Sequence, residues 1–263
     1  MWKNQRPFLN GLVRKFRPKK IVELGVMKGG ASSIILNAIQ DIPDSHLYSI
    51  DINNNNGIGN CVYKYFPQFT NKWTLFKGNM AAKFMENIGK EIDMAIFDTV
   101  HYEPGEILDF LMVLPFLKEE AVISFHDIAN QINFAGEPET RHEWVPYIIF
   151  NLVRGKKFYP SGENILLHDI GGIILDKNQK KYHYDYFRAL GGQWEYFLKE
   201  KHVTLIRDFF KKYYDEVCLS IFDEAIKFNR NFVKNNKRQG FYSSKAWSNY
   251  YQYKAIKNYE LSE

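Results

Sequence analysis

The sequence is poor in cysteine and has no long apolar segment. Its 263 residues include only two cysteines, Cys61 and Cys218, which lie far apart. Their number and spacing exclude a disulfide framework and a CxxC metal pair, so we expect a reducing compartment, the cytoplasm. No apolar run reaches the roughly 18 residues of a transmembrane helix, and the opening MWKNQRPF lacks the apolar region of a signal peptide. We therefore expect a soluble protein without membrane insertion.

A strong excess of charge of one sign is also missing. The formal net charge is +5 and the isoelectric point is about 8.9. This mild excess is not the signature of a dedicated nucleic-acid binder, so we expect no nucleic-acid partner; it fits an anionic cofactor or an acidic acceptor equally well. The chain is instead rich in apolar residues, which make up 45% of it, and in aromatic residues, which make up 16%. This content is enough for one α/β core with added elements.

Short apolar segments alternate with helical patterns over the first two thirds of the chain. Strands are expected at residues 21–24, 46–50, 73–76, 93–97, 121–125 and 171–175. Helices are expected at residues 31–39, 82–88, 107–117 and 143–153, after an amphipathic helix that ends near Pro18. This alternation predicts an α/β protein with a parallel, doubly wound sheet.

The pattern changes in the C-terminal part of the chain. Residues 194–234 carry apolar positions at spacings of three and four, which predicts two helices that pack on the domain or on a partner. We therefore divide the chain into a domain of residues 1–180 and a C-terminal helical extension of residues 181–263. A homo-oligomer could form through these C-terminal helices.

The segment IVELGVMKGGASS combines the end of a strand, a glycine-rich turn and the start of a helix. Glycines can adopt positive φ and let the backbone approach a ligand, and a helix N-terminus offers free N–H groups. The spacing is neither that of the dinucleotide fingerprint G-x-G-x-x-G nor that of a P-loop. The candidate cofactor contacts here are Glu23, Gly25, Lys28, Gly29, Gly30 and Ser32.

The order E-L-G-x-x-x-G-G-A-S resembles motif I of class I S-adenosylmethionine (SAM)-dependent methyltransferases. In that family the glycine turn passes under the amino-acid moiety of SAM. The resemblance covers about residues 20–175 and implies a Rossmann-like sheet whose late strand, residues 171–175, is antiparallel. It also implies that domain 1–180 binds SAM.

Two further strand ends fit the same resemblance. Asp51 ends the second strand, where an acidic side chain can accept hydrogen bonds from ribose hydroxyls. Gly78 and Asn79 follow the third strand, where the family has a residue pair that contacts adenine. Asn79 stands where Asp is usual, and the alternative is a helix N-cap.

Polar residues also follow the fourth and fifth strands. Asp98, His101 and Asp109 resemble the pattern D-x-x-H-x-x-x-x-x-x-x-D of a methyltransferase subgroup that includes sugar and antibiotic O-methyltransferases, and His126–Asp127 resembles its closing H-D pair. We assign Asp98, His101, His126 and Asp127 to catalysis, and Asp98 also to cofactor binding. Asp109 is expected to be a solvated helix position.

Methyl transfer to a hydroxyl needs alignment of the reactants and removal of a proton. His101 or His126 could be the base, because imidazole titrates near neutral pH. Alternatively, Asp98 and Asp127 could hold Mg²⁺, which would acidify the acceptor hydroxyl. Ile128 stands where catechol-type relatives have Asn, which weakens the expectation of a metal.

The resemblance therefore predicts a SAM-dependent O-methyltransferase for a small polar acceptor, such as a sugar or a sugar-bearing metabolite in natural-product or polysaccharide modification. Residues 130–142 are the expected lid, with Arg141 and His142 as candidate acceptor contacts; the alternative is a surface insertion. N-methylation stays open. Two other classes also stay open: an NAD-type nucleotide-binding enzyme and a non-catalytic, methyltransferase-like assembly protein.

Overall fold

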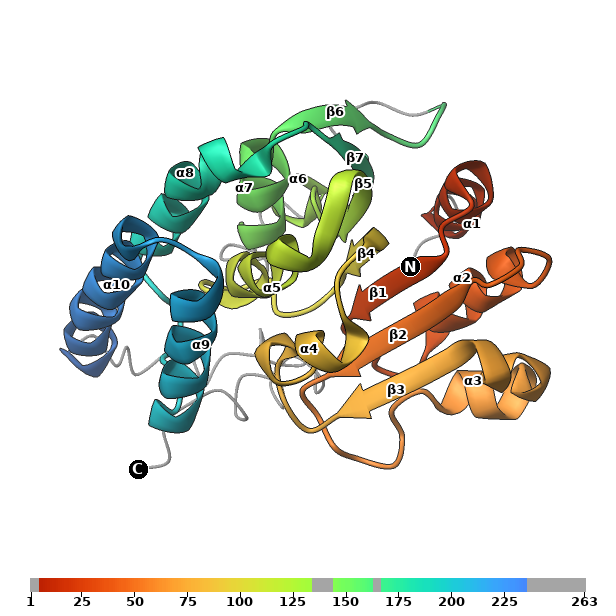
Figure 1. The fold of residues 1–263 in the computed structure, drawn as a ribbon, viewed down its shortest axis with the longest axis horizontal. Helices are drawn as coiled ribbons and strands as arrows, with labels where there is room; N and C mark the ends of the chain where they lie inside the picture. Colours follow the sequence, from red (N-terminus) through yellow and green to blue (C-terminus); the bar gives the residue numbers. More distant parts are fainter. Residues whose placement is uncertain (1–4, 134–143, 163–166, 236–263) are drawn as a thin grey trace.

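A mixed sheet forms the centre of the computed structural model, which describes residues 5–133, 144–162 and 167–235 (Figure 1). The sheet has seven strands in the order β3-β2-β1-β4-β5-β7-β6. The strands are β1 (Lys20–Leu24), β2 (His46–Asp51), β3 (Trp73–Lys77), β4 (Ile92–Phe97), β5 (Leu117–His126), β6 (Gly155–Phe158) and β7 (Ile170–Leu175). Strands β1 to β5 pair in parallel, whereas β7 is antiparallel to β5 and β6. This confirms the predicted Rossmann-like sheet with its late antiparallel strand.

Helices cover both faces of the sheet (Figure 1). One face carries α1 (Gln5–Phe16), α2 (Gly30–Ile39) and α3 (Asn60–Tyr65). The other face carries α5 (Gly105–Val113), α7 (Val145–Leu152), α8 (His183–Arg188), α9 (Glu200–Tyr213) and α10 (Glu216–Asn235). The short helices α4 (Met85–Ile88) and α6 (Asn130–Asn133) follow β3 and β5. Because β1 and β4 are covered on both sides, nearly all of their residues are buried and most are apolar, as is usual for parallel sheets.

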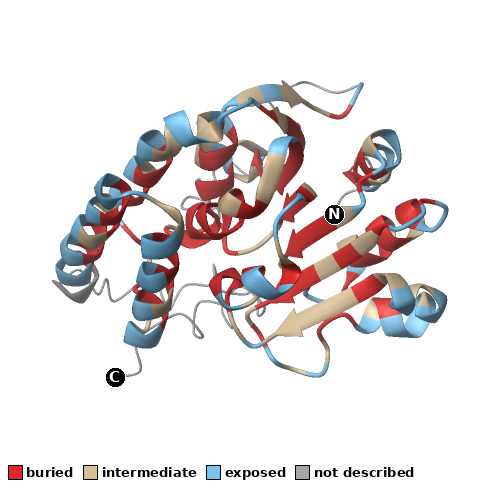
Figure 2. Ribbon diagram, in the orientation of Figure 1, coloured by how far each residue is buried: buried red, intermediate tan, exposed pale blue. Residues whose placement is uncertain are grey.

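The C-terminal helices share the core of the sheet. The ring of Tyr186 in α8 lies 5.3 Å from Phe110 in α5, and Phe210 in α9 lies 5.1 Å from Phe222 in α10. All four side chains are fully buried, and Figure 2 shows exposed residues on the outer sides of α9 and α10. The two predicted C-terminal helices are thus confirmed, while the division at residue 180 and the homo-oligomer stay predictions. In the described parts of the chain, no helix combines the length and apolarity needed to cross a membrane.

Several predicted boundaries are wrong. The helix expected to reach residue 117 ends at Val113, because Pro115 follows in a 3-10 turn and β5 already begins at Leu117. The helix expected over residues 82–88 is divided into a 3-10 turn and α4, which meet at Phe84. Strand β6 and helix α3 were not predicted, since both are short and lack a clear apolar period.

Candidate active site

The loop between β1 and α2 is built around two glycines with left-handed backbone angles. Gly25 has a φ of 85° and Gly29 a φ of 86°, which residues with a side chain rarely adopt. A Cβ atom on Gly25 would lie 1.8 Å from the carbonyl oxygen of Asp98, so only glycine lets β1 turn this close to the end of β4. A Cβ atom on Gly30 would meet no other atom within 4 Å. The turn therefore leaves open space at the start of α2.

Glu23 lies beneath this turn and is fully buried. Its Oε2 atom accepts hydrogen bonds from the hydroxyls of Ser32 (2.6 Å) and Ser49 (2.5 Å). Burial raises the pKa of Glu23 to about 7, although the two hydrogen bonds lower it. The negative charges of Asp98 and Asp51 raise the pKa by smaller amounts. Glu23 and Ser32 thus tie β1, α2 and β2 together, and their direct contact with a ligand stays a prediction.

Asp51 ends β2 with its carboxylate turned toward the glycine turn. Its Oδ2 atom accepts the N–H groups of Val26 (3.1 Å) and Met27 (2.9 Å), and its Oδ1 atom accepts the N–H of Asn53 (2.8 Å). Each carboxylate oxygen has two lone pairs, so Oδ1 keeps capacity for one further donor, such as a ribose hydroxyl. The ribose contact stays a prediction, and the structure gives Asp51 a second task, which is to hold the turn.

The other predicted cofactor residues surround the turn. Lys28 and Gly78 are exposed. The N–H of Gly78 donates to the carbonyl of Asp51 (2.9 Å), which fixes the end of β3 beside the end of β2. The Oδ1 atom of Asn79 accepts the N–H of Met80 (3.0 Å), consistent with a polar residue that starts a helical turn. The adenine contact predicted for Gly78 and Asn79 stays a prediction.

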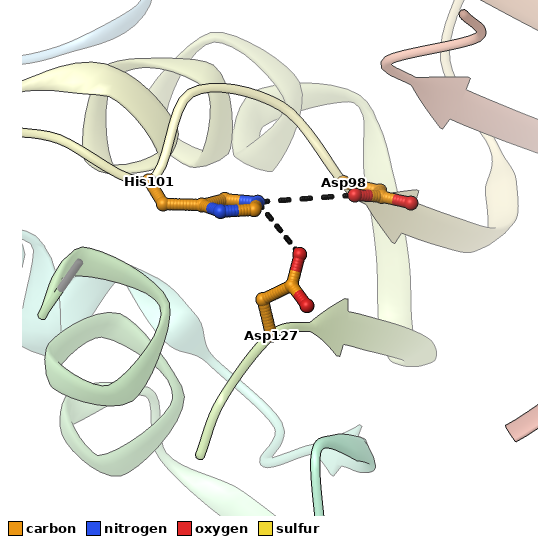
Figure 3. Close-up of side chains that lie close together, drawn as sticks. All are labelled: Asp98, His101 and Asp127. Atoms are coloured by element: carbon orange, nitrogen blue, oxygen red, sulfur yellow. Dashed lines mark ion pairs between the residues drawn. The ribbon is translucent and has the colours of Figure 1, made fainter. Parts of the chain in front are cut away.

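Four ionisable side chains converge where β4 and β5 end. The Nε2 atom of His101 lies 3.0 Å from Oδ2 of Asp127 and 3.8 Å from Oδ1 of Asp98. The Nδ1 atom of His126 lies 2.9 Å from the same Asp127 oxygen and 3.6 Å from Oδ1 of Asp98. Figure 3 shows the nitrogen of His101 facing both carboxylates, which come from the ends of two neighbouring strands. The structure thus brings together all four residues predicted to be catalytic.

Two residues that the sequence did not reveal complete this cluster. The Nε2 atom of His126 lies 2.9 Å from Oε1 of Gln5 in α1, and the Nε2 atom of Gln5 donates to Oδ2 of Asp169 (3.1 Å). The other oxygen of Asp169 accepts the N–H of Ala129 (3.0 Å). Asp169 could have been found, because it precedes an antiparallel strand whose start lies at the same edge of the sheet. Gln5 carries no such signal.

The charges in the cluster shift the pKa values of its members in different directions. Burial disfavours the charged ring of His126, but the carboxylates of Asp127 and Asp98 outweigh it and raise the pKa of His126 to about 9. Burial also opposes ionisation of Asp127, yet the imidazoles of His126 and His101 hold its pKa well below the usual range. Burial and the charge of Asp127 raise the pKa of Asp169 to about 7. At neutral pH the cluster therefore contains a His126 cation beside an Asp127 anion.

A protein-family model matches the segment that holds the glycine turn and the four residues predicted to be catalytic. Residues 22–128 match a protein-family model that is described as a methyltransferase domain. This segment of the chain is similar to a methyltransferase domain. The match begins in β1 and ends one residue after Asp127, so it includes the glycine turn and the four predicted catalytic residues, but neither Gln5 nor Asp169. The match to the family model confirms the predicted enzyme class, a methyltransferase. A separate comparison with curated proteins found no match.

Solved structures share the fold of this chain. The O-methyltransferase TomG from Streptomyces achromogenes, in complex with SAM, has a TM-score of 0.50 at 15% identity, over 66% of this chain and 81% of that one. An O-methyltransferase from Bacillus cereus, in complex with S-adenosylhomocysteine (SAH), has a TM-score of 0.51 at 13% identity, over 66% of this chain and 82% of that one. The SAH-bound methyltransferase PaMTH1 from Podospora anserina has a TM-score of 0.50 at 12% identity, over 66% of this chain and 78% of that one. At these identities the likeness establishes the fold.

Two more acids lie behind the cluster, on α5. The Oε1 atom of Glu106 accepts the N–H of Thr99 (3.0 Å) and lies 4.0 Å from Nε2 of His101. Glu106 is fully buried, and burial raises its pKa to about 8. The expectation that Asp109 is solvated is wrong: its side chain is 4% exposed, because α5 is covered by the sheet and the C-terminal helices. Burial raises the pKa of Asp109 to about 7.

The metal hypothesis can be tested against the donor atoms. One ligand atom each from Asp98, His101 and Asp127 lies within 4.8 Å of the others. Mg²⁺ prefers six oxygen ligands in an octahedron, whereas one of these three donors is a nitrogen and the next side chain, Ile128, is buried and apolar. The charged His126 also competes for the Asp127 oxygen. This set fits Mg²⁺ poorly, and it suits a divalent transition metal that accepts imidazole better.

Other features of the described part of the chain do not enlarge the site. Most of the predicted lid, with Arg141 and His142, lies outside the described residues. A cavity of about 360 Å³ opens at the opposite edge of the sheet. Two of its lysines, Lys118 and Lys212, are already paired with carboxylates. The cluster between β4 and β5 therefore remains the candidate site.

Proposed function

We propose that this chain is a SAM-dependent O-methyltransferase that acts on a small polar acceptor. The observation that carries the proposal is the convergence of Asp98, His101, His126 and Asp127 at the strand ends, with the turn of Gly25 packed against Asp98. Ligands of open α/β sheets bind at this edge. A cofactor on the turn would lie next to the ionisable cluster.

The turn supports SAM in particular. The open space above Gly30 gives a ligand access to the first N–H groups of α2, and the free Oδ1 lone pair of Asp51 suits a ribose hydroxyl. SAM supplies an electrophilic methyl group on a sulfonium. The side chains of this chain then have to orient an acceptor and remove its proton.

His101 is the proposed base. His126 is protonated at neutral pH and cannot accept a proton, whereas His101 faces the Asp127 carboxylate, which stabilises a positive charge on its ring. The acceptor oxygen forms a bond to the methyl carbon while the carbon–sulfur bond breaks. The hydroxyl proton moves to His101, and the sulfonium becomes the neutral thioether of SAH.

The acceptor class rests on the motif resemblance alone, which favours a sugar or a sugar-bearing metabolite. A cytoplasmic setting is supported by Cys61 and Cys218, which are both free thiols. An amine acceptor would need the same base, so the acceptor screen has to include amines as well as hydroxyls.

Titration calorimetry with SAM, SAH and NAD tests the proposal. We expect about micromolar binding of SAM and SAH and none of NAD, because the turn lacks the dinucleotide fingerprint. Asp51→Ala should abolish SAM binding, whereas Asp41→Ala, at an exposed acid of the same region, should not. Failure of the wild-type protein to bind either SAM or SAH would refute the cofactor assignment.

A further inference from the structure

We infer that Gln5 is a positioning residue of the methyl-transfer site: it holds the His126 ring in the orientation that directs Nδ1 at Asp127. Gln5 lies in the first turn of α1, 121 positions before His126, and outside the segment that matches the methyltransferase family. The inference rests on the proposed function for its catalytic consequence. The contacts that carry it do not depend on that function.

The amide of Gln5 is buried and joins two strands of the sheet. Its side chain is 1% exposed, and it bridges His126 at the end of β5 and Asp169 at the start of β7. A buried amide must satisfy both its oxygen and its nitrogen, because an unpaired polar group that is shielded from water destabilises the fold. The contacts with His126 and Asp169 satisfy both the oxygen and the nitrogen of the Gln5 amide.

The direction of the two hydrogen bonds of Gln5 determines the orientation of the His126 ring. The Nε2 atom of Gln5 donates to Asp169, which leaves Oε1 as the acceptor that faces His126. The Nε2 atom of the imidazole must therefore carry a hydrogen and point at α1. A ring fixed at Nε2 presents Nδ1 on its other side, where it lies 2.9 Å from Asp127.

Loss of the bridge would release this orientation. A half-turn of the imidazole would place a carbon where Nδ1 now meets Asp127, and the carboxylate would lose one of its two imidazole contacts. Asp127 also faces the proposed base, His101. Gln5 would thus affect turnover without touching the cofactor, since the glycine turn and Asp51 belong to β1 and β2.

Nitrogen NMR of histidine-labelled protein tests the bridge directly. In the wild type we expect a slowly exchanging Nε2–H signal from His126, assigned by its absence in His126→Gln. Gln5→Leu, which keeps the size of the side chain, should lose this signal, whereas Arg6→Ala, at the exposed neighbouring position, should keep it. An unchanged His126 signal in Gln5→Leu would overturn the inference.

Turnover tests the catalytic consequence. SAH release from SAM is measured with glucose, catechol and ethanolamine as acceptor probes. We expect kcat of Gln5→Leu to fall about tenfold or more, with the SAM dissociation constant unchanged; a kcat within about twofold of the wild type would contradict a positioning role. If the wild type binds no SAM, the proposed function fails, while the NMR result still decides the bridge.

A compensating pair guards against misfolding of the first variant. Gln5→Glu places a second acid beside Asp169 and should lower kcat. Adding Asp169→Asn restores a donor on one side and an acceptor on the other, with the polarity of that hydrogen bond reversed. We expect the double variant to recover both the His126 signal and kcat relative to Gln5→Glu, and no recovery would count against the bridge.

Discussion

Asp127 is the residue on which the candidate site depends. It follows β5 with a φ of 56°, in the left-handed region that Asp adopts more readily than most residues. This backbone turn brings one carboxylate oxygen within 3.0 Å of both His101 and His126. One acid thereby serves two imidazoles, and the different surroundings of the two rings separate their roles.

His101 and His126 should consequently respond differently to substitution. His101→Ala removes the proposed base, so kcat should fall by about 100-fold or more while the SAM dissociation constant stays unchanged. The measurement is SAH release with the acceptor probes, combined with calorimetry. Full turnover of His101→Ala on any of the probes would show that another group takes the proton.

Asp109 makes a prediction about stability and pH. Burial raises its pKa in the folded state to about 7, above the value of about 3.9 in an unfolded chain. The unfolded state therefore releases its proton first, so the free energy of unfolding falls as the pH rises from about 4 to about 7. Asp109→Asn removes this contribution.

Urea denaturation at pH 5 and pH 8 measures the effect. Relative to the wild type, Asp109→Asn should lose less stability between the two values, whereas Glu119→Gln, at an exposed acid, should match the wild type. Parallel curves for Asp109→Asn and the wild type would mean that Asp109 is ionised in the folded protein.

At the scale of elements, the β1–α2 turn is where sequence and geometry agree best. Gly25 and Gly29 adopt the positive φ values for which glycine is needed, and Gly30 has no such constraint. The glycines of the motif are therefore not equivalent. One is required by a neighbouring strand, and another leaves room for a ligand.

We therefore expect substitutions of Gly25 and Gly30 to have different effects on stability. Gly25→Ala should lower the melting temperature and abolish SAM binding, because its Cβ would overlap the carbonyl of Asp98. Gly30→Ala, at the start of α2, should leave the melting temperature within a few degrees of the wild type. Thermal melts and calorimetry distinguish the two, and equal melting temperatures would contradict the geometry.

The sequence predicted those parts of the fold that have a local signal. Strands such as β4 are short apolar runs that end in an acid, so both the element and Asp98 could be found. Strand β6, GKKF, has no apolar run and exists only because β7 offers it a partner. The burial of Asp109 could not be predicted, since α5 is covered by α7, α8 and α9, which all come later in the chain. The role of Gln5 in the site could not be predicted for the same reason, because its partners His126 and Asp169 lie more than 100 residues away in the chain.

At the scale of the whole molecule, the C-terminal helices complete the domain's core. Phe210 in α9 is fully buried between Phe187 in α8, at a ring distance of 4.9 Å, and Phe222 in α10, at 5.1 Å. The same cluster continues through α5 to the sheet. Because one core joins both parts, residues up to 235 should unfold together with the methyltransferase fold.

Phe210→Ala tests this unity. Truncation of a buried Phe costs about 3–5 kcal/mol, and a shared core passes that loss to the whole domain. We expect one cooperative transition at a lower temperature, with the near-ultraviolet signal and SAM binding lost together. Val217→Ala, at a position 55% exposed in α10, should change little. If Phe210→Ala instead gave two transitions, with SAM binding retained after the first, the C-terminal helices would be a separately folding unit and the division near residue 180 would be a true domain boundary.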